Sequence, residues 1–143
     1  MSILHVTING HQITNGQYIQ FDQSQINPKI QFVRGKTDNY VIIMVDPDAP
    51  SRDNPIYKYY LHMIIINNST QIVKYQKPSP PPGSGNHRYK FYLLKQSNEL
   101  DKNILRDLIG SDKKIKRENF DLNKFIIDNK LKVVDTVFFE TSR

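Results

Sequence analysis

Two nearly unbroken runs of β-branched and apolar residues constrain this chain more than any other feature. The first covers residues 39–46 (NYVIIMVD) and the second covers residues 60–67 (YLHMIIIN). Runs of this length without polar alternation are typical of strands that are buried on both faces. The two segments are therefore predicted to be inner strands of a sheet that carries a packed layer on each side.

The rest of the chain reads mainly as shorter strands separated by turns. Polar and apolar residues alternate, or form short β-rich runs, in six further segments: 5–10, 17–21, 26–32, 69–76, 88–96 and 132–140. Helices are expected only near the C-terminal end. This order predicts a mainly β fold, an antiparallel β-sandwich with two short helices, formed by residues 1–143 as a single domain.

The two predicted helices are marked by capping residues and apolar stripes. The segment 98–111 offers Asn98 as N-cap and Gly110 as the stop. The segment 120–131 offers Asp121 as N-cap. The stripes expected to face the core are Leu100, Ile104, Leu105 and Leu108 in the first helix, and Leu122, Phe125 and Ile126 in the second.

Composition excludes several classes of protein. The 143 residues contain no cysteine, so disulfides, thiolate metal sites and a cysteine nucleophile are impossible. No apolar run approaches the roughly 18 residues that span a bilayer, and the strand-like N-terminus does not resemble a signal peptide. We therefore expect a cytoplasmic protein. The net charge is +6, but lysines gather only at 112–118, a run more typical of a solvated loop than of a nucleic-acid groove.

A short loop with two acids follows the first apolar run. In DPDAPSR, residues 46–52, two prolines restrict the backbone around Asp46 and Asp48. Rigid loops on a scaffold are common places for binding sites. A turn that merely caps the strand would use the same residue types, and the residues alone leave these two alternatives evenly balanced.

A second loop, PSPPPGSGNHRY at residues 78–89, leads into a later strand. Gly83 and Gly85 allow positive φ angles and can turn backbone N–H groups towards a bound anion. His87 and Tyr89 follow at alternate positions, so their side chains share one face of the strand. Together with His62 in the second apolar run, they predict one shared site rather than isolated core or surface residues.

These motifs resemble the two signature regions of the phosphatidylethanolamine-binding protein family, which includes Raf kinase inhibitor protein, plant flowering regulators and the yeast carboxypeptidase inhibitor. The resemblance covers residues 38–139 and implies a β-sandwich with a small anion pocket. It also implies a cis Ala49–Pro50 bond and, because the chain ends at Arg143, a short form without the family's C-terminal helix. The residues expected to bind ligand are Asp46, Asp48, Pro50, Tyr60, His62, Pro80, Gly83, Gly85, His87 and Tyr89.

The resemblance implies non-enzymatic binding of phosphate-type anions or phospholipid head groups, and the chemistry of these residues is compatible with it. Protonated His62 and His87 would donate hydrogen bonds to phosphate oxygens, while Asp46 and Asp48 would orient them or accept from an ammonium group. Arg52 and Arg88 are expected to pair with acids and to brace the loops. No cofactor and no nucleic-acid partner are expected.

Three alternatives stay open at this stage. A kinase or protease inhibitor would act through its surface. A hydrolase could use the same acids and histidines as Zn²⁺ or Mn²⁺ ligands, but the spacing of known metal motifs is absent. A serine triad would need Ser51, Ser79 or Ser84, and none has the sequence context of a nucleophile. We therefore predict neither a metal site nor catalysis.

Overall fold

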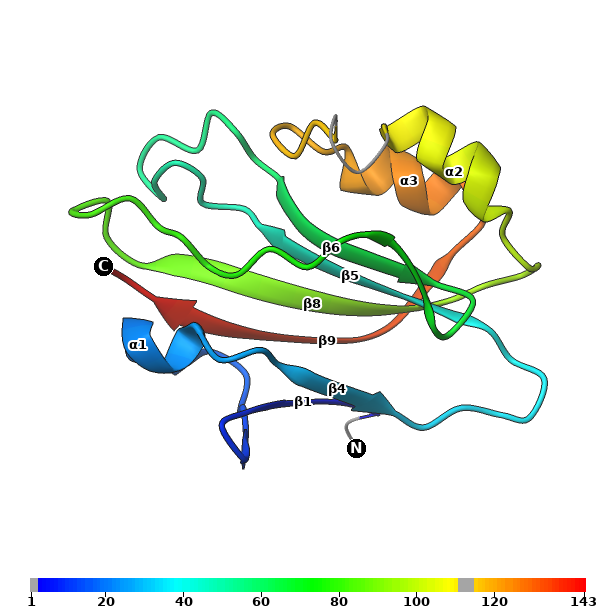
Figure 1. The fold of residues 1–143 in the computed structure, drawn as a ribbon, viewed down its shortest axis with the longest axis horizontal. Helices are drawn as coiled ribbons and strands as arrows, with labels where there is room; N and C mark the ends of the chain where they lie inside the picture. The colour runs from blue at the N-terminus through cyan, green and yellow to red at the C-terminus, as the bar shows by residue number, and fades with distance from the viewer. Residues whose placement is uncertain (1–2, 111–114) are drawn as a thin grey trace.

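The computed structural model describes residues 3–110 and 115–143 and shows three layers (Figure 1). The small sheet has the strand order β2 (His11–Gln12), β1 (Leu4–Ile8) and β4 (Lys29–Phe32). The main sheet has the order β3 (Gln17–Tyr18), β9 (Lys132–Thr141), β8 (His87–Lys95), β5 (Tyr40–Asp46), β6 (Tyr60–Ile66) and β7 (Thr70–Val73). Helices α2 (Lys102–Ile109) and α3 (Leu122–Asp128) cover the other face of the main sheet.

Strand β5 is buried along its whole length, as its apolar run predicts. Its side chains alternate between two cores. Ile42 and Met44 pack between the two sheets, whereas Ile43 and Val45 pack under the helices. A strand with a packed layer on each face needs apolar residues at every position, and this explains the absence of alternation in the sequence.

The pairing of the main sheet differs in one place from the predicted antiparallel sandwich. Strand β3 pairs with β9 in parallel, with Gln17 opposite Phe139. The predicted strand 17–21 is also shorter than expected, because the chain turns into α1 (Phe21–Ser24). The last bond to β9 joins the backbone N–H of Ile19 to the carbonyl oxygen of Glu140 at 2.8 Å. The other pairings in both sheets are antiparallel.

The helices confirm one predicted cap and correct another. Asp121 caps α3 through the backbone N–H of Lys124, as predicted. Helix α2 is capped by Asp101 instead of Asn98 and therefore begins later than the sequence suggested. Of its predicted stripe, Leu105 is buried and Leu100, which precedes the helix, packs against the core in part, whereas Ile104 and Leu108 are 59% and 78% exposed. Because α2 is short and lies near the edge strand β7, it buries a narrow stripe.

A β-bulge in β6 interrupts the pairing next to β5. Met44 lies opposite Met63 and Val45 lies opposite Leu61, so His62 is the extra residue on the bulged strand. Leu61 packs under the helices and Met63 packs between the sheets. Bulges redirect side chains locally, and here the bulge lets His62 occupy the end of the sheet without shifting the core residues on either side.

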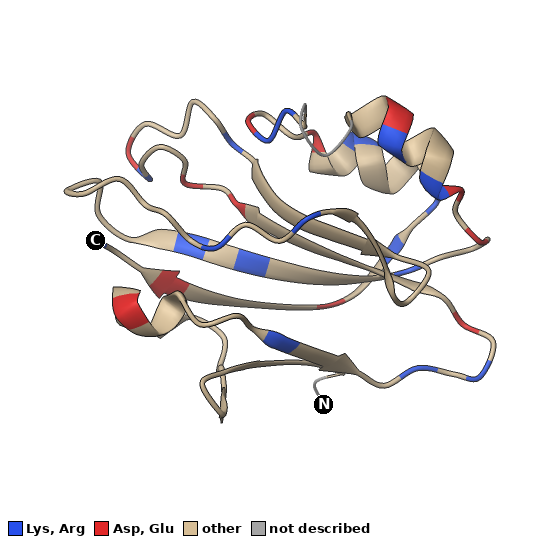
Figure 2. Ribbon diagram, in the orientation of Figure 1, with Lys and Arg blue, Asp and Glu red and all other residues tan. Residues whose placement is uncertain are grey.

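Charged residues are distributed over the whole fold. Figure 2 shows lysine and arginine in all three layers and in several loops, with acidic residues interspersed among them. The lysine-rich segment 112–118 lies partly outside the described residues. Among the helices that the structure describes, none is long and apolar enough to cross a membrane.

The buried position of Ile64 gives a test of the two-core arrangement. Ile64 is fully buried under the helices, so Ile64→Ala should lower the free energy of unfolding by about 2–5 kcal/mol. Ile127 is 74% exposed on α3, and Ile127→Ala should change it by less than about 0.5 kcal/mol. Denaturant unfolding of both variants would make the comparison. Equal effects would contradict the assignment of these two faces.

Candidate ligand-binding site

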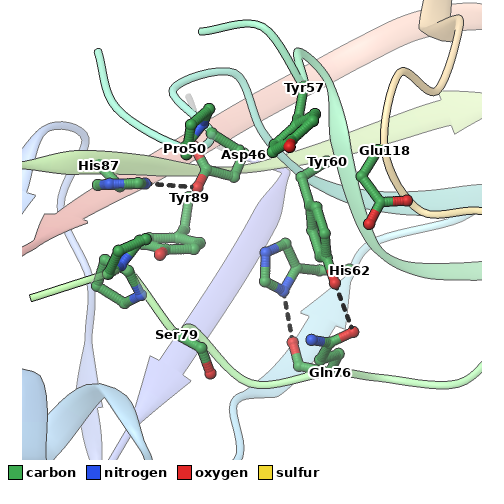
Figure 3. A pocket seen from close by; sticks show the side chains of 13 residues that line it. Asp46, Pro50, Tyr57, Tyr60, His62, Gln76, Ser79, His87, Tyr89 and Glu118 are labelled. Atoms are coloured by element: carbon green, nitrogen blue, oxygen red, sulfur yellow. Dashed lines mark hydrogen bonds and ion pairs between the residues drawn. The ribbon is translucent and has the colours of Figure 1, made fainter. Parts of the chain in front are cut away.

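A small cavity lies at one end of the main sheet, where β5 ends and where β6 and β8 begin (Figure 3). Antiparallel pairing brings these three strand ends together, which explains why motifs far apart in the sequence meet here. The cavity encloses about 210 Å³. It is lined by Asp46, Ala49, Pro50, Tyr57, Tyr60, His62, Gln76, Ser79, Pro80, Pro81, His87, Tyr89 and Glu118.

Most of the residues expected to bind ligand line this cavity, but three do not. Asp48, Gly83 and Gly85 lie outside its lining. The residues that the sequence analysis missed come chiefly from the loops, namely Ala49, Tyr57, Gln76, Ser79, Pro81 and Glu118. Ala49 lies inside a recognised motif and could have been found from it. Gln76 and Glu118 carry no such signal, because the fold alone brings their loops to the cavity.

Asp46, His87 and Ser84 form a continuous chain of hydrogen bonds. The buried carboxylate of Asp46 lies 2.8 Å from Nδ1 of His87 and also accepts from the backbone N–H of Asp48 at 2.7 Å. Because a carboxylate only accepts, Nδ1 of His87 carries a proton. Nε2 of His87 lies 2.8 Å from the hydroxyl oxygen of Ser84.

The hydroxyl of Ser84 has two partners for its single proton. It lies 2.7 Å from the carbonyl oxygen of Pro81 as well as next to His87. When His87 is neutral, Ser84 can donate to Nε2. When His87 is protonated, Nε2 donates instead and Ser84 turns its proton to Pro81. The arrangement therefore accommodates His87 in either protonation state.

His62 is held in a different state from the one that the sequence suggested. Its ring is 3% exposed, and Nδ1 donates to the carbonyl oxygen of Gln76 at 2.6 Å. Burial lowers the pKa of His62 to about 4. At neutral pH the ring is therefore uncharged, with Nε2 left as an acceptor. Donation from a protonated His62 to phosphate therefore stays a prediction, and it would require a bound anion to raise this pKa.

Aromatic rings form much of the cavity wall around His62. The rings of Tyr60 and His62 are 5.1 Å apart between centroids, and those of His62 and Tyr89 are 5.3 Å apart at 81°. Tyr89 also stacks on Phe139. Burial, together with nearby Asp46 and Asp48, raises the pKa of Tyr89. Its phenol therefore remains protonated and can act as a hydrogen-bond donor.

Asp48 braces the loop from outside the cavity. Arg88 contacts it with its backbone N–H and two guanidinium nitrogens, at 2.7–2.9 Å. Arg52 lies 3.6 Å from Asp48 and pairs with Glu140 at 3.1 Å. The expected pairing of both arginines with acids is therefore confirmed. Asp48 fixes the position of the loop, while Asp46 faces the cavity.

The glycine loop forms a turn beside the cavity. Gly83 and Gly85 both have positive φ angles, 78° and 84°, as their sequence predicted. Neither lines the cavity. The role of this turn in the described structure is to place Ser84 next to His87.

Glu118 reaches the cavity from a segment that crosses the start of β6. The guanidinium group of Arg117 donates to the carbonyl oxygens of Leu61, His62 and Lys74 at 2.8–3.1 Å. The backbone N–H of Phe120 bonds to Tyr59 at 2.9 Å. Glu118 therefore lines the cavity from a position between two anchored residues, Arg117 and Phe120.

The geometry gives little support to a metal site or to a serine triad among the described residues. Within the described residues, no group of three histidine, aspartate or glutamate side chains could hold a metal ion. Ser84, His87 and Asp46 have the connectivity of a serine triad, but the Ser84 hydroxyl also bonds to Pro81 within its own turn. Ser84 is not among the residues that line the cavity.

The fold and the cavity together define a class of β-sandwich proteins with a small aromatic and polar cavity at the end of the main sheet. The family model for phosphatidylethanolamine-binding protein matches residues 6–138, and the chain belongs to this family. A phosphatidylethanolamine-binding protein homolog of Acanthamoeba polyphaga mimivirus is 54% identical over 138 residues, covering 96% of both chains. The resemblance inferred from the sequence is confirmed and extends further towards the N-terminus.

Solved structures share the fold. The carboxypeptidase Y inhibitor, in complex with its cognate proteinase, matches with a TM-score of 0.79 at 24% identity, covering 98% of this chain and 82% of that chain. The phosphatidylethanolamine-binding protein from Plasmodium vivax matches with a TM-score of 0.77 at 21% identity, covering 98% and 84%. As implied by the resemblance, the Ala49–Pro50 bond is cis.

The state of His62 can be tested by NMR titration of the histidine rings. We expect the His62 ring to titrate with a midpoint of about 4 and to carry its proton on Nδ1 at neutral pH. The physical reason is burial, which disfavours the charged ring. A midpoint near the ordinary value of 6.5 would contradict this account of the cavity.

Asp48 should make folding stability depend on pH. Burial tends to raise the pKa of Asp48, but its bonds to Arg88 and the charge of Arg52 outweigh this and lower it below 3.8. The ionised form therefore stabilises the fold above about pH 4, and this contribution is lost as pH falls through the lowered pKa. Asp48→Asn should cost about 1–3 kcal/mol near pH 7, and the difference from the wild type should shrink towards pH ~2.

Denaturant unfolding of the wild type and Asp48→Asn across this range measures the effect. The exposed residue Asp53 provides the control, because Asp53→Asn removes the same charge and no described ion pair. A stability difference for Asp48→Asn that stayed constant with pH would mean that its ionisation does not stabilise the fold.

Proposed function

We propose that the cavity binds small phosphate-containing ligands or phospholipid head groups, and that the protein acts by binding rather than by catalysis. The observation that carries this proposal is the size and lining of the cavity. A volume of about 210 Å³ is below the range of roughly 300–1,000 Å³ typical of drug-sized ligands. A head group fits such a space, whereas acyl chains would have to remain outside.

Several groups around the cavity can donate hydrogen bonds to a phosphate. Protonated His87 could direct its Nε2–H to a phosphate oxygen after displacement of Ser84, and the phenol of Tyr89 remains protonated. The side-chain amide of Gln76 and the hydroxyl of Ser79 are further possible donors among the lining residues. Neutral donors of this kind bind phosphate without adding charge.

A second candidate function is inhibition or scaffolding of a protease or kinase through the protein surface. The observation that favours it is the fold shared with the carboxypeptidase Y inhibitor, whose structure was solved with its proteinase. In this reading the cavity would regulate or shape a surface that contacts the partner. Binding of a head group and binding of a protein are compatible, because the cavity opens at the surface beside exposed loops.

Ligand binding can be tested with ¹⁵N-labelled protein and phosphoethanolamine. We expect shifts at Gln76, Ser79 and His87, with an affinity between micromolar and millimolar because few hydrogen bonds form in a partly hydrated site. Ser79→Trp should abolish these shifts by filling the cavity from an exposed position, whereas Ser69→Trp, at an exposed turn elsewhere, should leave them unchanged. Shifts confined to other surfaces would place binding outside this cavity.

A further inference from the structure

The start of β8 carries a cationic and aromatic surface on the face of the main sheet that points away from the small sheet. Tyr89 and Phe91 point into the core between the two sheets, so the alternating residues Arg88, Lys90 and Tyr92 point to the other face. The helices pack against β5, β6, β7 and the far end of β8. Figure 1 accordingly shows α2 and α3 towards that far end. Side chains at the start of β8 are therefore partly exposed.

Strand β9 adds an aromatic ring to this surface. Lys90 lies opposite Phe138, and Arg88 lies opposite Glu140, in the pairing of β8 with β9. Nζ of Lys90 lies 5.9 Å from the ring centroid of Tyr92 and 6.0 Å from that of Phe138. Cation–π attraction acts at such distances. It holds the ammonium group of Lys90 close to two rings on the open face of the sheet.

The loop before β6 brings a further cation and a further ring to the same face. Nζ of Lys58 lies 5.1 Å from the ring centroid of Tyr59. Tyr59 is close to β8, because it adds to the rise that burial causes in the pKa of Tyr92. Lys58, Tyr59, Lys90, Tyr92 and Phe138 together are called the sheet-face patch below.

The cations at this face repel one another. Burial lowers the pKa of Lys90, and the charges of Arg88 and Lys58 lower it further, whereas the carboxylate of Asp48 acts in the opposite direction. Asp48 is already bonded to the guanidinium group of Arg88 at 2.7–2.9 Å. An additional anion beside Lys90 would relieve the repulsion. The patch therefore complements a negative charge that is accompanied by apolar side chains.

The surroundings of the patch favour an extended peptide as its partner. A hollow of about 270 Å³ lies at its border, lined by Lys58, Tyr59 and the segment 119–123. Phe120 and Leu122 supply apolar lining there, and Asp121 is engaged in capping α3. Because the helix layer stands beside the open strands, a flat bilayer would meet the helices first. An extended chain can lie along β8 and place a side chain in the hollow.

We propose that the sheet-face patch docks an acidic segment of a partner protein, with a carboxylate at Lys90 and apolar side chains against Tyr92 and Phe138. This proposal deepens the second candidate function, on which it rests, and does not involve the cavity. His87 and Tyr89 line the cavity from the opposite face of β8. A head group and a partner protein can therefore be bound at the same time.

NMR titration and calorimetry with defined peptides test the docking surface. The acidic probe is a short peptide of glutamate and leucine, and the neutral probe has glutamine at every glutamate position. We expect the acidic peptide to shift the signals of Lys90, Tyr92 and Phe138. It should bind roughly five- to tenfold more tightly than the neutral peptide, the gain expected for one charge-assisted contact at a partly exposed site.

Three variants show whether the contact is local. Lys90→Gln removes the cation and should weaken the acidic peptide roughly five- to tenfold, without affecting the neutral one. Lys90→Arg keeps the charge and should retain binding. Lys29→Gln is the matched control, because it makes the same charge change at an exposed strand residue of the small sheet. Equal losses for Lys90→Gln and Lys29→Gln would indicate attraction to the net charge of +6 and overturn the proposal.

Phosphoethanolamine titration of the same samples separates this inference from the cavity proposal. If phosphoethanolamine shifts Gln76, Ser79 and His87 but the acidic peptide does not bind, the cavity proposal stands and the docking surface is wrong. If the peptide binds through Lys90 and phosphoethanolamine does not bind, the docking surface stands and the cavity proposal fails. A peptide that shifts the cavity residues instead of Lys90 contradicts the docking surface. A peptide bound elsewhere, and unaffected by Lys90→Gln, supports the second candidate function but rejects this face.

Vesicles of phosphatidylglycerol and a single-stranded RNA serve as other anionic probes. We expect neither to show binding that depends on Lys90, because the bilayer meets the helices first and a nucleic-acid strand needs a row of cations along its backbone. Binding of either probe that is tighter than that of the peptide, and is lost in Lys90→Gln but not in Lys29→Gln, would assign the patch to that partner. Such a result would overturn the assignment to a protein.

Discussion

The hydrogen bond between Asp46 and His87 is the interaction on which the arrangement of the site depends. It joins the end of β5 to the start of β8 at 2.8 Å, and both side chains are almost completely buried. Removing one partner of such a buried hydrogen bond leaves the other polar group unsatisfied, which typically costs about 1–3 kcal/mol. The same bond orients the His87 ring, and Ser84 and the glycine turn are placed against that ring. The cavity wall and the end of the sheet are therefore stabilised together.

Neighbouring acids in one short loop perform different tasks. Asp46 faces the cavity, while Asp48 turns towards Arg88 and Arg52 outside it. The ion pairs of Asp48 with Arg88 and Arg52 tie the loop to β8 and, through Glu140, to β9. They fix the position of Asp46 from outside the cavity. Glu118 differs from both, because anchoring acts on its backbone and leaves its carboxylate free of described partners. Acids that look alike in the sequence thus occupy three different environments, one bonded to a histidine, one paired with arginines and one without a described partner.

Sequence patterns predicted most of the strands and the family, but less of the site. Strands β5 and β6 could be predicted because a strand buried on both faces needs apolar residues at nearly every position. The stripe of α2 was misjudged because nothing in the sequence states how much of a short helix the neighbouring strand covers. The direction of Asp48 and the arrival of Glu118 depend on contacts between distant segments. The charge state of His62 follows from its burial beside Gln76, which no local motif reveals.

Because of the bulge in β6, His62 lines the cavity without taking part in the register between β5 and β6. Without His62, Leu61 and Met63 would be consecutive residues that point into opposite cores, and their partners Val45 and Met44 would already be in register. Loss of a single codon would thus convert the bulged strand into a regular one and leave the hydrophobic cores intact. A lineage could discard the cavity histidine while keeping the sandwich, or acquire it by one insertion. The pairing of β5 with β6 therefore does not depend on the histidine that lines the cavity.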